Sequence, residues 1–587
     1  MPVSDGGPMG LLALLAVAFP LAGALAAALR AVPERVLLRA SWVAPLPALV
    51  LAVSAPGPDV VARVEVAWLL LGLEMAVDPW ARVLLVLAGS LWLAAGVALP
   101  TLLRDDRRSS RFASAFQAAL AGMLLLVLAA DVVTFYTGFA LVTYASYVLV
   151  VHNATERAVR AGRIYLVFGV VGEALLLAGL AVAVGVAGTT ALGDVAAAAG
   201  EGAAAGVPVL LLVGFGIKAG MLGVHSWLPL AHPAAPVPAS AILSGAIITA
   251  GVLGWLRLLP LGDSPLPAFG PVVVGIGVAG FLAGAVLGAL QDDPKTVLAY
   301  SSVSQIGLVL VPVGIGLAAP ELATPAGSVA IVFALHHGLA KGALFLGVGV
   351  AQAESRSRPR RAVLLGQTAA AAAIAGLPLT SGMVAKGLLK DLAEGVTQPW
   401  GGALYLALLL SGTASTVLLG RMLWLLTAQG GHEPPPGAAA PWSSVLAWLL
   451  ALGCSFAVTW PVVGGWLPGV APPAVTDVGL WWDQSWPVAV GVGMLWGLSR
   501  VGPAPSVPAG DLVLAAEAAA TRLRGTAALG GAVIGLPPLR RALAGSVERA
   551  RAAQARTESL FARPMVTALL VLLLLVGVLA ALGVTWP

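Results

Sequence analysis

The sequence contains a single cysteine. Cys454 lies inside an apolar run, so a disulfide within the chain is excluded. One thiol cannot build a cysteine-ligated iron–sulfur cluster or structural zinc site. We therefore expect the chain itself to hold no cofactor and no metal, and any redox centre of a larger assembly to lie in another subunit.

Charged residues are also scarce. They make up 10% of the 587 residues, whereas 59% are hydrophobic, and the mean hydropathy is +0.96. Soluble domains carry about 25% charged residues. The composition therefore predicts an integral membrane protein. Its apolar runs are continuous and rich in Leu and Ala, which favours helices over the alternating strands of a barrel.

The apolar runs predict an all-α polytopic membrane protein. A bilayer core about 30 Å thick needs roughly 20 apolar residues per helix, which gives about sixteen transmembrane helices here. The first run lacks a basic start, so we expect a retained span rather than a secretory signal. The runs begin near residues 8, 36, 81, 111, 131, 161, 206, 236, 270, 295, 325, 362, 401, 441, 485 and 565.

The distribution of arginine predicts an orientation. If the spans alternate from an outer start, the inner loops receive the arginine clusters at 30–39, 104–111, 157–163 and 356–361. Basic residues accumulate in the inner loops of membrane proteins. We therefore expect a multi-pass protein of a bacterial inner (plasma) membrane with both termini on the outer, periplasmic side.

Two segments depart from a simple succession of spans. Within residues 57–80, "VARVEVAW" alternates like a short strand on the outer surface. Residues 503–563 are rich in Ala and Arg, with Arg on most faces of a helix. This composition predicts an amphipathic segment on the inner surface, either a solvated linker or a brace along neighbouring subunits.

Lysine is rare, since only five of the 32 basic residues are Lys. Arginine stays protonated, whereas a buried lysine can gain and lose a proton. Placing lysine at the bilayer centre costs about 2.5–3.5 kcal/mol. We therefore predict proton handling by Lys218, Lys341 and Lys386, with structural ion pairing as the alternative. Lys295 could equally snorkel to the interface, and Lys390 is expected to be a boundary charge.

The lysine contexts suggest an internal duplication. Lys218 follows "GFG" in a span that ends in a proline cluster, and Lys386 follows "GLPLTSG". Gly- and Pro-interrupted apolar segments in two halves of a chain are typical of inverted repeats with broken helices at the transport site.

A second cluster lies in "IVFALHHGLAKGALFLGVG". His337 and Lys341 are four residues apart on one helix face, with His336 on the neighbouring stripe. Imidazole titrates near neutral pH, so the cluster could pass protons. A histidine pair bonded to carbonyls is the alternative, and metal is disfavoured because no acid or Cys shares the segment. His225 either continues the row of proton-handling groups that begins at Lys218 or forms a hydrogen bond at the interface.

One motif is misleading. "GIGVAG", residues 275–280, matches a dinucleotide-binding pattern but lies inside a span, where small residues are better explained by helix packing.

Four ordered motifs resemble one known family: "KAGMLGVHSWLPLAHPAAPVPASAIL", "DDPKTVLAYSSVSQIGL", "HHGLAKGALFL" and "GLPLTSGMVAKGLL". They resemble the antiporter-like proton-translocating subunits of respiratory complex I, Mrp-type cation/proton antiporters and membrane-bound hydrogenases. The resemblance implies two inverted five-helix half-channels joined by a central polar axis. By position, Lys218 and Lys386 would be the proton carriers of the two halves. Lys341, with His336 and His337, would be the central relay.

This resemblance divides the chain into six regions. They are N-terminal spans with the outer strand segment (1–110), a first half-channel repeat (111–260), a second repeat (261–430), C-terminal spans (431–502), the surface segment (503–563) and a last span (564–587).

The sequence departs from the family pattern at two positions. Ala140, in "YTGFALVTYASY", occupies the place of a glutamate that pairs with the first lysine, and Ser244 replaces a usual His or Lys. A buried ammonium without a counter-charge is strongly destabilised. Glu173, in "FGVVGEALLL", is the expected substitute. Otherwise the acid comes from a neighbouring subunit, or the first half-channel is idle.

The expected function is proton translocation by a membrane subunit of a multi-subunit, complex I-like assembly, through a Lys/His/Glu relay. Its expected partners are other membrane subunits, protons or sodium, and the lipid bilayer, and not nucleic acid. Two alternatives are a subunit of a non-redox cation/proton antiporter or proton-driven transporter of a solute such as inorganic carbon, and a non-conducting scaffold. If the chain translocates ions, it would be the ion-translocating part of a larger oxidoreductase or of an antiporter.

Overall fold

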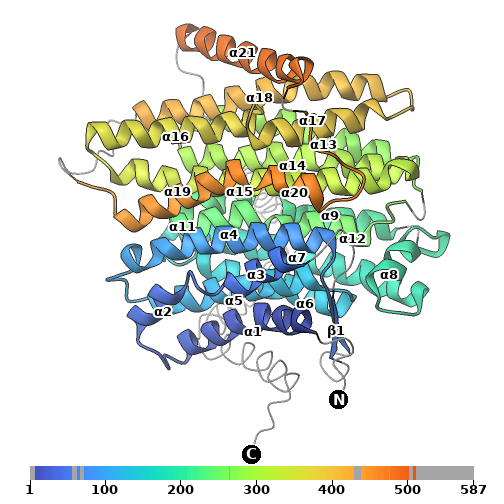
Figure 1. The fold of residues 1–587 in the computed structure, drawn as a ribbon, viewed down its shortest axis with the longest axis horizontal. Helices are drawn as coiled ribbons and strands as arrows, with labels where there is room; N and C mark the ends of the chain where they lie inside the picture. The colour runs from blue at the N-terminus through green and yellow to red at the C-terminus, as the bar shows by residue number, and fades with distance from the viewer. Residues whose placement is uncertain are drawn as a thin grey trace, which may run out of the picture.

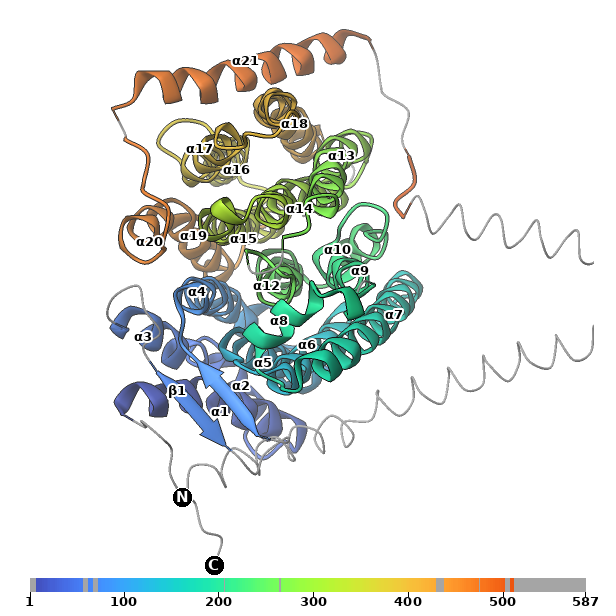
Figure 2. The same ribbon diagram turned by 90° about the vertical axis from the view of Figure 1, so that its right-hand side faces the viewer.

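A computed structural model describes residues 7–55, 62–66, 72–204, 206–262, 265–428, 438–474, 476–501 and 507–510. In this part of the chain most helices lie side by side along one common direction (Figure 1), whereas α21 (Val478–Val501) runs across them (Figure 2). Eleven of the helical segments described are long and apolar enough to cross a membrane. The chain is therefore an all-α, multi-pass membrane protein, as predicted. The span predicted near residue 565 and nearly all of the surface segment lie outside the described residues.

Nine of the predicted spans are single helices, and five are assembled from shorter helices. The single helices are α1 (Pro8–Ala28), α4 (Pro79–Leu102), α5 (Ser109–Leu128), α6 (Val132–Val150), α7 (Glu156–Ala187), α13 (Phe269–Ala289), α14 (Pro294–Ala318), α15 (Ala323–Ala353) and α18 (Gly401–Ala428). The helix at the run predicted near residue 485, α21 (Val478–Val501), is not among the eleven candidate spans. The composite segments are α2 and α3 (Glu34–Ala40, Leu46–Ser54), α9 and α10 (Val207–Ala219, Leu228–Ala234), α11, η2 and α12 (Val237–Ile242, Leu243–Ile247, Thr249–Leu258), α16 and α17 (Ser357–Ala375, Ser381–Glu394), and α19 and α20 (Trp442–Ala457, Thr459–Gly465). A short α8 (Leu192–Ala199) precedes α9.

The predicted strand is present. β1 (Arg63–Val66) pairs antiparallel with β2 (Leu73–Ala76), and the side chains of β1 alternate between exposed and buried. Asp131 fixes this hairpin to the start of α6. Its carboxylate accepts from the backbone N–H of Glu74 at 2.9 Å and caps the helix by accepting from the N–H of Thr134 at 2.8 Å.

Two helices are interrupted at a glycine. α9 ends at Ala219, and Gly220 follows in a left-handed conformation with φ 81°. α16 ends at Ala375, and Gly376 follows with φ 94°. Only glycine adopts this conformation without strain. The breaks place Lys218 in the last turn of α9 and Lys386 near the start of α17.

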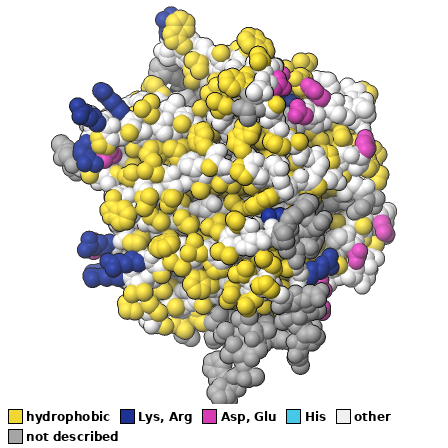
Figure 3. Space-filling model, in the orientation of Figure 1, with side chains coloured by type: hydrophobic (Ala, Val, Ile, Leu, Met, Phe, Trp, Pro, Cys, Tyr) yellow, Lys and Arg dark blue, Asp and Glu magenta, His cyan; other side chains and the backbone are white. Residues whose placement is uncertain are grey.

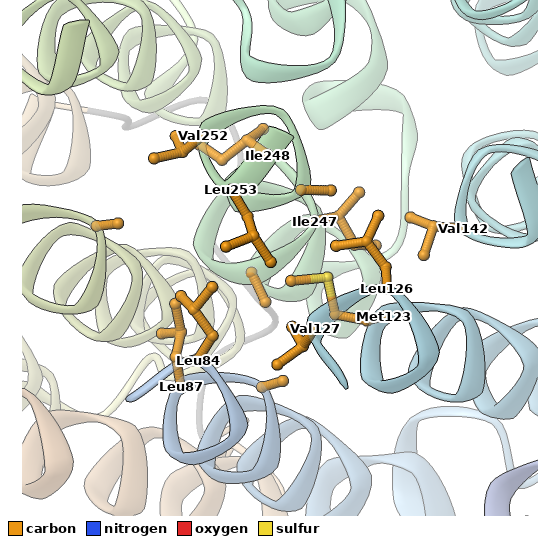
Figure 4. Packing of buried hydrophobic residues seen from close by; sticks show 14 of the residues in the cluster. Leu84, Leu87, Met123, Leu126, Val127, Val142, Ile247, Ile248, Val252 and Leu253 are labelled. Atoms are coloured by element: carbon orange, nitrogen blue, oxygen red, sulfur yellow. The ribbon is translucent and has the colours of Figure 1, made fainter. Parts of the chain in front are cut away.

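Close apolar packing fixes the interrupted segments within the bundle. Figure 4 shows Leu84 and Leu87 of α4 and Met123 and Leu126 of α5 directed toward the segment formed by η2 and α12. That segment is completely buried, as are α14 and most of α15. It therefore crosses the bundle between the two halves of the chain, where Figure 2 shows α12 below α14 and α15.

The motif at residues 275–280 serves helix packing, as predicted. A Cβ added at Gly277 would lie 2.7 Å from the carbonyl oxygen of Gly307, so the backbones of α13 and α14 touch here. Gly275, two residues earlier, has no neighbouring heavy atom within 4 Å of an added Cβ.

We expect Gly277→Leu to destabilise the protein by about 1–3 kcal/mol or more, because the added side chain overpacks the helix crossing. Gly275→Leu is the matched control and should unfold at the wild-type temperature. Thermal unfolding in detergent, followed by fluorescence-detected gel filtration, measures both. Equal stabilities would show that the crossing is not tightly packed.

Candidate functional site

The three lysines predicted to carry protons are all buried. The exposed fractions are 4% for Lys218, 0% for Lys341 and 1% for Lys386. They lie on α9, α15 and α17, and Figure 2 shows α15 between the half of the bundle with α9 and the half with α17. The structure therefore distributes the amines over both halves and the centre and does not gather them in one pocket.

Lys218 lies in a polar cluster between α6, α7 and α9. Its Nζ donates to Thr143 Oγ1 at 2.6 Å and to the Tyr165 hydroxyl at 3.4 Å. The amine also lies 5.0 Å from the centre of the Phe139 ring, a distance at which an aromatic face attracts a cation. A small cavity of about 10 Å³, roughly the space of one water molecule, borders Lys218 along a glycine-lined seam between α7 and α9.

Glu173 belongs to the same cluster. Its side chain is 5% exposed, and the Tyr144 hydroxyl donates to Glu173 Oε2 at 3.1 Å. Thr143 and Tyr144, which bind the amine and the carboxylate, are neighbours on α6. They lie one turn after Ala140, so the carboxyl group of Glu173 lies close to the position where the family pattern places its glutamate.

The central cluster connects α15 to α14 and η2. Lys341 Nζ donates to the Leu298 carbonyl at 2.6 Å. The ring of His337, which is completely buried, lies beside the backbone of Ser244. The Ser244 hydroxyl in turn shares a hydrogen bond of 2.7 Å with Ser302. Ser244 thus joins the central cluster with a neutral hydroxyl.

The two adjacent histidines face different neighbours. His336 Nδ1 lies 2.8 Å from the hydroxyl of Ser381, the first residue of α17, whereas His337 faces η2. Successive residues of a helix are about 100° apart, which accounts for the divergence. His336 is therefore the side chain that links α15 to the helix of Lys386.

Lys386 is held by oxygen atoms of α16 and α18. Its Nζ donates to the carbonyls of Ala375 and Ser411, both at 3.1 Å, and to Ser415 Oγ at 3.2 Å. Gln305 of α14 donates to the same hydroxyl at 3.2 Å. The glycine at the break also makes room for the amine, because a Cβ at Gly376 would lie 2.8 Å from Lys386 Cδ.

The remaining predicted residues lie near the turn between α10 and α11 or at helix ends. Lys295 donates to the Ala235 carbonyl at 2.9 Å and to Ser240 Oγ at 3.5 Å, so its amine points toward the turn before α11. His225 is 1% exposed, and its ring lies 5.9 Å from that of Tyr300. Lys390 lies one turn before the end of α17; its side chain is 5% exposed, and its amine donates to the Asp483 carbonyl at 2.9 Å.

One residue was overlooked in the sequence. His232 is completely buried, and its ring stacks on Phe345 at 5.0 Å. Its carbonyl accepts from Ser240 Oγ at 2.9 Å, which connects it to the turn that Lys295 also contacts. The sequence feature that could have indicated His232 is its position between the prolines of "LPLAHP", inside the same motif as Lys218.

Helices interrupted at glycine, with buried lysines beside the breaks, define a polytopic membrane protein built like an ion translocator. Residues 129–409 match the family described as "NADH:quinone oxidoreductase/Mrp antiporter, TM". This region, just under half of the chain, carries the sequence pattern of the antiporter-like family that its motifs predicted.

Individual proteins with similar sequences point to the same family. The chain is 33% identical over 395 residues to NADH-quinone oxidoreductase subunit L of Mycobacterium tuberculosis (strain CDC 1551 / Oshkosh), covering 63% of this chain and 60% of that protein. It is 32% identical over 239 residues to hydrogenase-4 component B of Escherichia coli (strain K12), covering 39% and 36%. The matches thus span about a third to three fifths of these relatives.

The fold also has a solved counterpart. A chain in the structure of the Mrp complex from Dietzia sp. DQ12-45-1b superposes with a TM-score of 0.68 at 24% identity, over 94% of this chain and 63% of that chain. At this identity the likeness establishes the fold.

Proposed function

We propose that the chain is a proton-translocating, antiporter-like subunit of a multi-subunit, complex I-like membrane assembly. One observation carries the proposal: the amine of Lys218 and the carboxylate of Glu173 lie in one buried cluster, bound to the adjacent Thr143 and Tyr144. A lysine and a carboxylate that share a water-poor site can exchange between a charged and a neutral pair. Such a pair can therefore take up and release a proton.

The proposed relay has three parts. Lys218 with Glu173 serves the first half of the chain, Lys341 with His337 serves the centre, and Lys386 serves the second half. Charges repel strongly in a medium of low dielectric constant, so a proton on one lysine disfavours a proton on the next. His336 supports the last step, because its contact with Ser381 leads from α15 to the helix of Lys386.

The proposed architecture comprises sixteen spans and two inverted five-helix repeats, with both termini on the outer side. The matching glycine breaks before α10 and α17 support the repeats. Figure 3 supports the orientation, because most visible Lys and Arg side chains gather at the left end of the helices and most visible acidic ones at the right. Basic residues mark the inner side.

The proposed partners are other membrane subunits, which would hold any redox centres. The printed names of the relatives, a subunit of NADH-quinone oxidoreductase and an Mrp complex, support an assembly of several chains. Protons are the proposed ion, with sodium as the alternative cation.

The test is proton flux in proteoliposomes that contain the purified native assembly, driven by an imposed pH gradient and followed with a trapped dye. We expect Lys218→Ala and Lys386→Ala each to reduce the flux at least about tenfold, because each removes a proton-transfer group. Detergent unfolding temperatures control for misfolding. Unchanged flux in both variants would leave only a scaffold role.

A further inference from the structure

A cavity of about 180 Å³ opens at the arginine-rich end of the helices, where α4 and α6 end and α11 begins. It is lined by the polar residues Asp106, His152 and Asn153, by residues 236–238, and by the apolar side chains of Leu99, Leu102, Leu103 and Phe112. A water molecule needs roughly 10–15 Å³ of such space. The cavity is therefore large enough for a chain of several water molecules.

A carboxylate and an imidazole meet in this cavity. His152 Nε2 lies 2.9 Å from Asp106 Oδ2, and the exposed side-chain fractions are 1% for His152 and 35% for Asp106. The carboxylate is thus at the mouth and the ring is inside. His152 Nδ1 has no hydrogen-bond partner among the residues that the structure describes, so this nitrogen can accept a proton.

The turn that forms one wall of the cavity also accepts hydrogen bonds from polar residues. Asn153 Nδ2 donates to the Ala234 carbonyl at 3.0 Å, and Lys295 donates to the next carbonyl, that of Ala235, at 2.9 Å. Ser240 joins the same turn to His232. A single turn of chain therefore separates the cavity from the half-buried Lys295 and the buried His232.

We propose that Asp106 and His152 form the proton-loading site of the chain on its arginine-rich side. Asp106 draws protons from bulk water to the mouth, and the pair of Asp106 and His152 holds one there until cavity water carries it to the turn that holds Lys295. The net step moves one proton and makes no covalent bond. The proposal rests on the proton-translocating function proposed above and names the entry of that same path.

The charged groups around His152 determine how the site responds to pH. They are Asp106 and Arg108 from the segment between α4 and α5 and Arg111 from α5, while α11 contributes an apolar wall. Burial lowers the pKa of the His152 imidazole, the Asp106 carboxylate raises it, and the two arginines lower it. Removing the Asp106 charge should therefore lower the pKa of His152 further and leave fewer protons bound near neutral pH.

The test compares flux in proteoliposomes of the native assembly, with protons entering from the arginine-rich side. Asp106→Asn and His152→Gln should reduce flux about tenfold near pH 8 and less than about threefold near pH 6, because a loading site matters most when protons are scarce. Asp105→Asn removes the same charge from the exposed neighbouring residue and should behave as wild type. Asp106→Glu should restore most of the flux.

The outcomes separate the two proposals. Wild-type assembly without proton flux overturns the proposed function and the loading site with it. Normal flux in wild type together with equal pH profiles for Asp106→Asn, His152→Gln and Asp105→Asn overturns the loading site alone. A loss that is the same at every pH and is not restored by Asp106→Glu indicates a structural role and also overturns it.

A second measurement does not depend on transport. Val237 is half-buried and lines the cavity. Val237→Cys in a Cys454→Ser background should react with a charged, membrane-impermeant thiosulfonate added to the arginine-rich side, because the reagent modifies thiols in contact with water. No reaction from that side would show a dry cavity and overturn the proposal.

Discussion

Glu173→Gln is expected to lower the proton flux of the reconstituted assembly by about a hundredfold, since a positioned proton-transfer group contributes about 10²–10⁴-fold. Glutamine fills the same volume but cannot ionise. The Lys218 amine then loses the charge that stabilises its protonated state, while its hydrogen bonds to Thr143 and Tyr165 remain. The variant should therefore fold normally and fail in proton exchange. Flux and the detergent unfolding temperature measure the two properties.

A second-site change tests where the charge is needed. Ala140 lies on α6 one turn before Thr143 and Tyr144, the residues that bind Lys218 and Glu173. We expect Ala140→Glu combined with Glu173→Gln to recover much of the lost flux, because it returns a carboxylate to the same cluster from the other helix. Tyr144→Phe removes only one hydrogen bond and should cost a few-fold at most.

Wild-type flux in Glu173→Gln would contradict this assignment. The counter-charge of Lys218 would then come from a neighbouring subunit, or the first half of the chain would not conduct. Lys218→Ala separates these two cases: it lowers flux if a neighbouring subunit supplies the counter-charge, and leaves flux unchanged if the first half does not conduct.

Local patterns were sufficient to predict the helices, the strand and the broken segments. Apolar length located the spans, and the alternation in "VARVEVAW" predicted β1, because both depend on nearby residues. The glycine breaks next to Lys218 and Lys386 were also readable, since the Gly/Pro interruptions lie in the same short segments as the lysines. For the same reason, residues 275–280 were correctly interpreted as a packing surface.

Contacts between distant segments were less predictable. Glu173 was singled out because it is an acid on the span next to that of Ala140, but its link to Lys218 through α6 depends on how three helices pack. The burial of Lys390 depends on Asp483 of α21, which is 93 residues away. Helix periodicity predicted that His336 and His337 diverge, but the neighbours they meet, Ser381 of α17 and Ser244 of η2, depend on tertiary packing.

Lys341 offers the sharpest test of whether the relay works by changing charge. The amine is completely buried on α15 and donates to the Leu298 carbonyl at 2.6 Å. Arginine preserves a positive charge there but stays protonated at any relevant pH. We expect Lys341→Arg to reduce proton flux about a hundredfold, as strongly as Lys341→Met, because neither variant can alternate between charged and neutral forms at this position.

Lys390→Arg is the matched control. Lys390 is also a buried lysine bound to a carbonyl, on α17 one turn after Lys386, and the proposed relay does not use it. It should tolerate a permanent charge and retain most of the wild-type flux. Unfolding temperatures in detergent separate loss of transport from loss of fold, since arginine is the larger side chain. If Lys341→Arg conducts while Lys341→Met does not, a fixed charge is sufficient at the centre, and charge alternation along the lysines is not the mechanism.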